Sequence, residues 1–508
     1  MLNRLATIRD QKLSLWQSAV EEVVAEKIGE LTLVGKEMLE GATLHILAED
    51  GKADLPAGPP SSEAAAEADR PRAFAFLSKK LFDHANAESG DSGERSFSIS
   101  DLRSKIMKKL RSVRLSELRS LNLDDLRSLS PADLFDLVRD ALPDLTRNYG
   151  KDDLIGWAQC IVAYVNHLKR AGGKPRYEDW KAKVPPDPNF GVLDYRLPDN
   201  AKVVMIGDWG SHMTDNVAML RQALKRFKPD AIIHLGDVYY SGTPFECKRN
   251  VLDVMDELVK ELGIQRPPFF TIPGNHEYYS GGADFHDMIG KINAGIAGAQ
   301  QQASYFCLRT KDDKWQLLGM DTGLGDRIPG LKVGPGLDAS EAEWHAHKLK
   351  AFPGSTILLS HHPLFSANSP VNKVGEKQYM NNKLLETFSP FFDRVAAWYW
   401  GHEHNLVMFK DELFGLKRGR LLGCGAFQLS DEQDPYKINF DKVSYIDEMP
   451  KLGLSKEKFY NHAFALLEFS LQQINVTYYQ YPSWDRDFAD PHPDLTDPLH
   501  SETILPAR

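Results

Sequence analysis

Five short motifs place aspartate, asparagine or histidine directly after an apolar run. In chain order they are GDWG at 207–210, GDVYY at 236–240, GNHE at 274–277, SHHP at 360–363 and GHEH at 401–404. Carboxylate and amide oxygens and imidazole nitrogens are ligands for divalent and trivalent cations. Two such cations that share one carboxylate can clamp a phosphate group. The motifs therefore predict a binuclear metal site.

Each motif alone is a weak signal. An aspartate after a strand is often a helix cap, and a buried histidine is more often a core residue than a ligand. The ordered set carries the prediction, because all five motifs follow predicted strands and all supply competent ligands.

The elements that must position these residues can be read from the same region. Apolar runs typical of buried strands occur at 203–206, 231–235, 268–272, 315–319, 355–360 and 395–400. Helical patterns at 216–227 and 251–262 alternate with them, which predicts an α/β domain with its site at strand ends. The stretch 462–482 predicts two more strands joined by a tight turn.

The remaining sequence suggests further regions. Residues 1–50 predict an amphipathic helical segment, 51–72 an Ala-, Pro- and Ser-rich linker, and 73–190 a helical domain that ends in a Pro-rich boundary. The catalytic domain is expected at 198–485 and an irregular tail at 486–508. The fold class is therefore α/β with an N-terminal all-helical extension.

The composition of the chain limits the kinds of partner that it can bind. The 508 residues are 42% hydrophobic and 26% charged, with a formal charge of −10, which argues against broad binding to nucleic acid or anionic membranes. The first residues lack a signal-peptide pattern, and no apolar run is long enough to span a bilayer. Four cysteines without a close pair predict no disulfide framework. We therefore expect a cytoplasmic protein.

The series GD, GDxxY, GNHE, HxP and GHxH resembles the calcineurin-like metallophosphoesterase superfamily, and within it the purple acid phosphatases, over roughly residues 200–430. This resemblance implies a metallophosphoesterase sandwich fold. Most members of the superfamily have Asp-x-His at the first motif, whereas this chain has Asp208-Trp209-Gly210. Purple acid phosphatases also lack that histidine and have a tyrosine after the second aspartate, where this chain has Tyr240.

The resemblance implies a set of ligands. The first metal would be bound by Asp208, Tyr240 and His404, the second by Asn275, His361 and His402, and Asp237 would bridge them. A phenolate is a hard anionic donor and favours ferric iron at the first position, with Fe, Zn or Mn at the second. Because no export signal is visible, manganese or zinc at the first position stays an alternative. His212 is a rival ligand.

The resemblance also implies a mechanism, in which a metal-bound hydroxide attacks phosphorus and His276 protonates the leaving group. His362 and His212 are candidate contacts to the substrate. Asp321, at the end of a predicted strand, is a candidate to orient a ligating imidazole. Tyr239 is expected to point away from Tyr240 and to pack in the core.

The leading interpretation is a phosphoesterase that acts on a small phosphorylated substrate. One alternative is a catalytically weak scaffold whose N-terminal helices bind a protein partner. Another is a cyclic-nucleotide phosphodiesterase, which the missing histidine after Asp208 disfavours.

Overall fold

The computed structural model describes Ala163, Tyr164, His167 and residues 173–507, apart from 328–334, 373–376, 427–428, 456–457, 484–494 and 496. The chain divides into two units, Met1–Lys174 with Ile328–Leu331, and Pro175–Arg327 with Lys332–Arg508. The predicted helical segment at 1–50, the linker at 51–72 and most of the helical domain at 73–190 lie outside the described residues. The following concerns the second unit.

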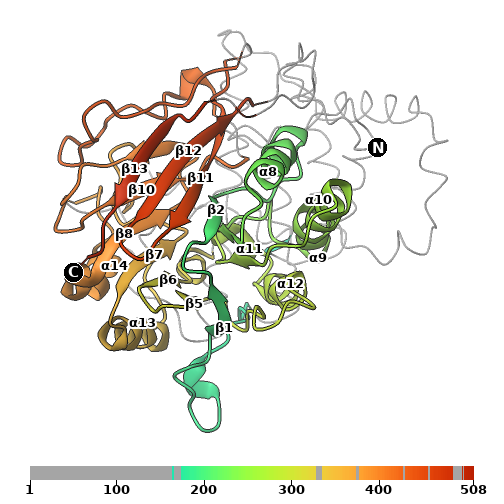
Figure 1. Cartoon of the computed structure of the whole chain (residues 1–508). Coiled ribbons are helices and arrows are strands. Elements are labelled where there is room, and N and C mark those ends of the chain that lie inside the picture. Colours follow the sequence, from blue (N-terminus) through green and yellow to red (C-terminus); the bar gives the residue numbers. More distant parts are fainter. Residues whose placement is uncertain are drawn as a thin grey trace, which may run out of the picture. The chain divides into compact units, whose positions relative to one another are not determined.

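Two sheets form the centre of this unit (Figure 1). The seven-stranded sheet has the order β1 (Val192–Leu197), β5 (Phe306–Thr310), β6 (Trp315–Gly319), β7 (Ser355–Ser360), β8 (Val395–Trp400), β10 (Gly419–Leu422) and β9 (Leu406–Met408). The six-stranded sheet has the order β13 (His500–Ile504), β12 (Ile474–Tyr481), β11 (His462–Phe469), β2 (Lys202–Ile206), β3 (Ala231–His234) and β4 (Phe269–Thr271).

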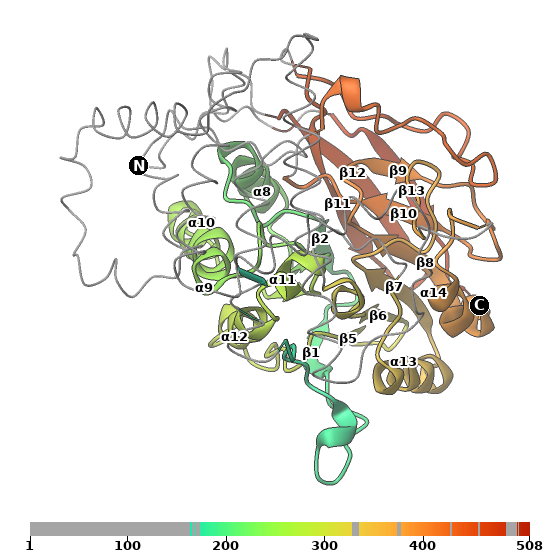
Figure 2. The same cartoon turned by 180° about the vertical axis from the view of Figure 1, so that it is seen from behind.

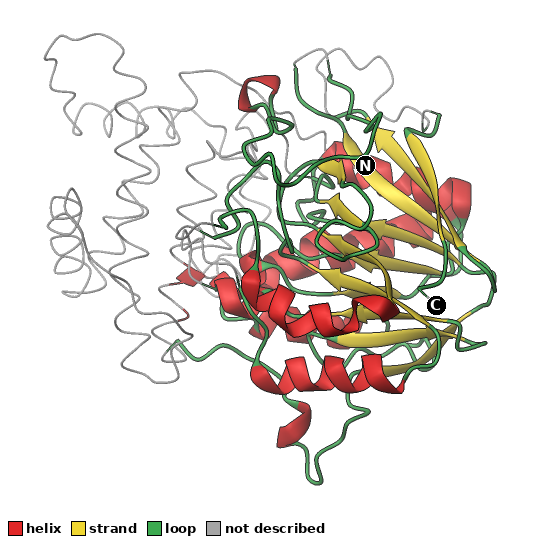
Figure 3. Cartoon of the chain, turned by 90° about the vertical axis from the view of Figure 1, so that its left-hand side faces the viewer, coloured by secondary structure: helices red, strands yellow, loops and turns green. Residues whose placement is uncertain are grey.

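Helices cover the outer face of each sheet (Figures 2 and 3). The six-stranded sheet packs against α8 (Thr214–Phe227), α10 (Val254–Leu262) and α12 (Ala283–Ile292), and the seven-stranded sheet against α13 (Ala339–Ala351) and α14 (Asn382–Phe388). The shorter helices are α9 (Pro244–Glu246), α11 (Asn275–Tyr279) and the π-helical η3 (Cys247–Asp253). The 3-10 segments are η2 (Trp180–Ala182), η4 (Gly323–Asp326), η5 (Ser389–Arg394) and η6 (Asp431–Gln433). Among the described residues, no helix has the length and apolar character needed to cross a membrane.

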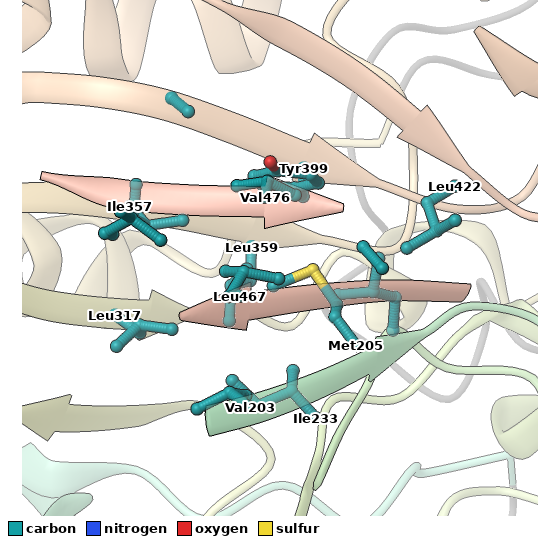
Figure 4. Close-up of a cluster of buried hydrophobic side chains, with 14 of the residues drawn as sticks. Val203, Met205, Ile233, Leu317, Ile357, Leu359, Tyr399, Leu422, Leu467 and Val476 are labelled. Atoms are coloured by element: carbon teal, nitrogen blue, oxygen red, sulfur yellow. The ribbon is translucent and has the colours of Figure 1, made fainter. Parts of the chain in front are cut away.

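The main core lies between the two sheets (Figure 4). Val203, Met205 and Leu467 from the six-stranded sheet meet Leu359 and Tyr399 from the seven-stranded sheet, and all five are fully buried. Strands β2 and β7 have apolar side chains on both faces because one face meets the other sheet and the opposite face meets helices. This layered packing fixes where each strand ends.

The strands before the motifs run parallel to one another. In one sheet β2 pairs with β3 and β3 with β4, and in the other β6 pairs with β7 and β7 with β8, all in parallel. The carboxyl ends of neighbouring parallel strands meet at the same edge of a sheet. The five motifs are therefore brought to the carboxyl edges of the two sheets.

The structure confirms the predicted α/β class and the predicted strands, including the hairpin of β11 and β12. The predicted tail at 486–508 is wrong in part, because β13 pairs with β12 and its Glu502 binds the buried Arg420. Strand β1, which begins at Val192, precedes the predicted start of the domain at 198. Residues 175–190 belong to this unit. Their one helical element is the 3-10 segment η2, because prolines interrupt any longer helix.

Candidate metal centre

Three donor atoms form a first group at the carboxyl edges of the sheets. The Tyr239 hydroxyl lies 3.2 Å from Asp208 Oδ1 and 3.2 Å from His404 Nε2. Asp208 Oδ1 and His404 Nε2 are 3.5 Å apart. Asp208 follows β2, and His404 follows β8 of the other sheet, so this triangle of donors joins the two sheets.

A second triangle of donors lies beside α11. His361 Nε2 is 3.1 Å from Asn275 Oδ1, and His402 Nδ1 is 3.2 Å from both of these atoms. Asn275 is the first residue of α11, His361 follows β7 and His402 follows β8. We name these sets the first group (Asp208, Tyr239, His404) and the second group (Asn275, His361, His402).

Asp237 belongs to both sides of the site. Its Oδ1 atom is 3.3 Å from His361 Nε2 in the second group. Asp237 also offers a carboxylate oxygen within 4.8 Å of ligand atoms of Asp208 and His404 in the first group. A carboxylate placed in this way can contribute one oxygen to each of two cations.

The donor geometry fits metal ions. Ligand atoms that each lie about 2.0–2.2 Å from a cation are roughly 3 Å apart along an edge of its coordination polyhedron. The edges of both triangles, from 3.1 to 3.5 Å, have this length. Oxygen and imidazole donors suit iron, zinc and manganese.

Unusual backbone conformations support the same site. Asp208, Asp237 and His402 have φ values of 56°, 74° and 70°. Left-handed conformations are uncommon in residues other than glycine, and they concentrate at functional sites when the surrounding structure enforces them. In each of these three residues, the turn after the strand directs the side chain along the edge of the sheets.

Two glycines make room for the carboxylates. A Cβ atom at Gly274 would lie 2.0 Å from Asp237 Oδ1, and one at Gly401 would lie 2.4 Å from Asp208 Oδ2. Any side chain at these positions would displace a carboxylate of the site. The glycines of GNHE and GHEH are therefore needed for close approach.

Two buried glutamates that the sequence analysis missed fix the loops. Glu277 Oε2 accepts hydrogen bonds from the amides of Gly274 (2.8 Å) and Asp237 (3.3 Å), and so ties two motifs together. The Glu246 carboxylate accepts from the amides of Tyr240 and Ser241. The capping box at 243–246, a threonine followed three residues later by glutamate, is the sequence signal that could have identified Glu246.

Hydrogen bonds also orient the second group. His361 Nδ1 is 2.9 Å from the carbonyl oxygen of Leu235. A carbonyl only accepts, so Nδ1 carries the hydrogen and the lone pair of Nε2 faces the triangle. Asn275 Nδ2 donates to the Tyr279 hydroxyl at 2.6 Å, which leaves Oδ1 for the site. His402 donates its backbone amide to Asp208 Oδ2 at 2.9 Å, which links the two groups.

Burial gives the site its electrostatic character. It raises the pKa of the Asp208 carboxyl to about 8. Burial, and secondarily the charge of Asp208, also raises the pKa of Asp237. Burial lowers the pKa of the His361 imidazole, so this ring stays neutral. A cation at the site would favour the ionised carboxylates and a neutral imidazole, which is the state that binds metals.

The tyrosine of the first group differs from the prediction. The resemblance implied Tyr240 for this place, and strand alternation predicted that Tyr239 packs away from it, but the Tyr239 hydroxyl lies in the triangle. Strand alternation does not extend to these tyrosines, because β3 ends at His234 and the chain turns at Asp237, which has a φ of 74°. Tyr240 contributes its backbone carbonyl, which lies 2.6 Å from His276 Nδ1.

His276 and His362 flank the donor triangles. Because His276 Nδ1 donates to the Tyr240 carbonyl, its Nε2 atom faces Asp237 Oδ2 at 3.9 Å. Burial lowers the pKa of His276 to about 3. The His362 ring lies 4.4 Å from the His402 ring, centroid to centroid, but its two nitrogens contact Thr322 Oγ1 and Asp326 Oδ2. A ring nitrogen of His362 also lies within 4.8 Å of ligand atoms of His361 and His402, so His362 borders the second group.

Asp321 and His212 lie outside both triangles, and Asp321 has other hydrogen-bond partners than predicted. Asp321 accepts hydrogen bonds from the Tyr278 hydroxyl and the Leu324 amide, so it holds α11 and a loop rather than a ligating imidazole. Asp321 follows β6, whose last residue, Gly319, pairs with Leu359 of β7. His212 lies in the turn between β2 and α8, with a φ of 59°, and belongs to neither triangle.

The chain is similar to known phosphoesterases. The family model described as calcineurin-like phosphoesterase matches residues 201–406. Tartrate-resistant acid phosphatase type 5 from Sus scrofa is 23% identical over 309 residues, covering 54% of this chain and 82% of that protein. The same enzyme from Mus musculus is 20% identical over 240 residues, covering 42% of this chain and 68% of that protein.

Solved structures align more loosely. A structure of PhoD has a TM-score of 0.38 and 11% identity, covering 57% of this chain and 67% of that chain. A putative 5'-nucleotidase from Staphylococcus aureus has a TM-score of 0.30 and 13% identity, covering 51% of this chain and 56% of that chain. The residues that match the calcineurin-like phosphoesterase model, 201–406, contain every residue of both donor triangles.

Proposed function

We propose that the protein is a binuclear metal-dependent phosphoesterase with an activity like that of acid phosphatases. The single observation that supports it most is the pair of donor triangles with Asp237 between them. In this proposal the first group binds one metal, the second group binds the other and Asp237 contributes to both. Tyr239 replaces Tyr240 in the predicted set.

The two bound metals would supply a hydroxide near neutral pH and neutralise the phosphoryl oxygens. The side chains of the chain then position the ester. The His276 imidazole is fixed through Nδ1, so Nε2 is the atom that can give a proton to the leaving oxygen. The negative charge of a bound phosphate would raise the low pKa of His276 and favour the protonated form.

The donor types favour different ions. The first group offers a carboxylate, a phenol and an imidazole, which suits a trivalent iron once both oxygens are ionised. The second group offers an amide oxygen and two imidazoles, all neutral, which suits divalent iron, zinc or manganese. Asp237 adds negative charge between them.

The substrate we propose is a small phosphate ester. The similarity to tartrate-resistant acid phosphatases supports a monoester. The formal charge of −10 disfavours large polyanions such as nucleic acids as substrates.

The test combines metal analysis with turnover. The purified chain should contain about two metal ions and hydrolyse an aryl phosphate. Asp237→Asn keeps the size of the side chain but weakens the shared ligand, so kcat should fall roughly 100-fold or more and bound metal should decrease. Inductively coupled plasma analysis and a chromogenic phosphate assay measure the two effects.

The matched control is Asp256→Asn, on the exposed face of α10, where Asp256 pairs with Arg266. It should retain wild-type metal content and turnover. A wild-type protein with two metals per chain and no turnover on any phosphate ester would refute the catalytic proposal and favour the scaffold.

A further inference from the structure

A segment that precedes the matched domain contacts the turn after the helix that carries Asn275 and His276. We call residues 175–190 the strap; it precedes β1 and appears in Figure 1 as the loop that extends below that strand. The helix α11 has only five residues, Asn275–Tyr279. A helix this short is not stable by its own hydrogen bonds, so other contacts must hold it.

Arg176 of the strap binds the turn that follows α11. Its backbone amide donates to the carbonyl of Gly281 at 2.9 Å, two residues after the helix ends. Its guanidinium donates to Asp287 Oδ1 at 2.7 Å, on the next helix, α12. Gly282 has a φ of 76°, and a Cβ atom there would lie 2.6 Å from the Tyr278 ring. The exit from α11 is thus packed tightly and tied to the strap.

Tyr177 reaches α11 through a chain of hydrogen bonds. Its hydroxyl donates to Glu341 Oε2 at 3.2 Å. Glu341 Oε1 accepts from the Asp321 amide at 2.8 Å, and the Asp321 carboxylate accepts from the Tyr278 hydroxyl. Glu341, Asp321 and Tyr278 are almost completely buried, so water does not compete for these bonds. Tyr278 is three residues after Asn275 on α11.

We propose that Arg176 and Tyr177 are positioning residues that fix α11 and thereby keep Asn275 Oδ1 in the second group. The inference rests on the proposed function, since Asn275 is there a ligand of the second metal. It assigns a role in the site to residues that precede the matched domain, which begins at 201. If these residues only stabilised the fold, their substitution would leave metal affinity and kcat unchanged.

The test uses the full chain with Tyr177→Phe, which keeps the ring and removes only the hydroxyl. Hydrogen exchange of the peptides that cover α11 should become faster. The affinity for the second metal should fall roughly 3- to 10-fold, less than for a residue that touches a metal ligand directly. The value of kcat should fall by a similar factor, with little change in KM.

Two further variants control the experiment. Lys181→Ala removes an exposed ion pair between the strap and Glu343, away from α11, and should behave as wild type. Tyr278→Phe breaks the other end of the same chain of bonds, so the double variant with Tyr177→Phe should lose little more metal affinity than either single variant.

Each outcome decides the matter. Unchanged exchange in α11, or faster exchange with wild-type metal affinity and kcat, would overturn the positioning role. A wild-type protein that binds no metal would instead refute the proposed function, and exchange in α11 would then still decide whether the strap anchors the helix.

Discussion

The two donor groups of the site differ in charge although they lie at the same edge of the fold. The first group contains two acidic oxygens, from Asp208 and Tyr239, whereas the second contains an amide and two imidazoles. The groups also differ in support, since α11 carries Asn275 and depends on contacts from outside the sheets. Under the proposed function, this difference favours an oxidised ion in the first group and a divalent ion in the second.

Removing one imidazole from each group gives the largest expected effect. His404→Ala should lower the metal content from about two ions per chain to about one, by loss of the first metal, and His402→Ala should do the same for the second. Both should reduce kcat roughly 100-fold or more. Metal analysis after identical loading measures which ion each variant retains.

The exposed His347 on α13 provides the control, and His347→Ala should keep both ions. If His404→Ala and His402→Ala lost the same ion, the division into two groups would be wrong.

The two tyrosines test whether the first group binds ferric iron. If the Tyr239 hydroxyl binds ferric iron as a phenolate, charge transfer should colour the protein, and Tyr239→Phe should remove that absorbance and lower kcat roughly 10-fold or more. Tyr240→Phe, the matched control, should keep the colour. Visible spectra of the iron-loaded variants measure this.

The reverse result, with loss of colour only in Tyr240→Phe, would restore the assignment made from the sequence. An iron-loaded wild type without colour would show that neither phenolate binds ferric iron.

The smallest expected effect is that of His276→Ala on nitrophenyl phosphate, because the loss depends on the leaving group of the substrate. His276→Ala should reduce kcat on alkyl phosphates roughly 100-fold but on nitrophenyl phosphate only a few-fold, because only a poor leaving group needs a proton. Parallel assays with the two esters measure the ratio. Equal losses on both esters would assign His276 to positioning beside Asp237 rather than to proton transfer.

The sequence predicted most of the site because each motif follows a strand, and a strand end is visible as the end of an apolar run. This located Asp208, Asp237, Asn275 and the three histidines of the two groups. The tyrosine could not be chosen in this way. The resemblance implied Tyr240, whereas the Tyr239 hydroxyl lies in the first group, because the left-handed backbone at Asp237 changes the direction of the side chains that follow β3. Alternation of side chains gives no information there.

Contacts between residues that are distant in the sequence could not be predicted either. The part played by Asp321 depends on Tyr278 and on Glu341, and no local pattern relates these residues. The strand β13 was missed because its five residues follow a proline-rich stretch and mix polar with apolar side chains. Its pairing with β12 is a property of the sheet edge and not of its own sequence.

The left-handed backbone at Asp208, Asp237 and His402 affects how the site can change through mutation. Asparagine adopts this conformation readily, whereas β-branched residues do so at a high energetic cost. Replacement of these aspartates by asparagine therefore alters charge and leaves the chain path intact, while valine or isoleucine would disturb both. Under the proposed function, one asparagine substitution would therefore weaken metal binding and activity while the architecture is kept, so a poorly active protein with an unchanged fold is a single step from this sequence.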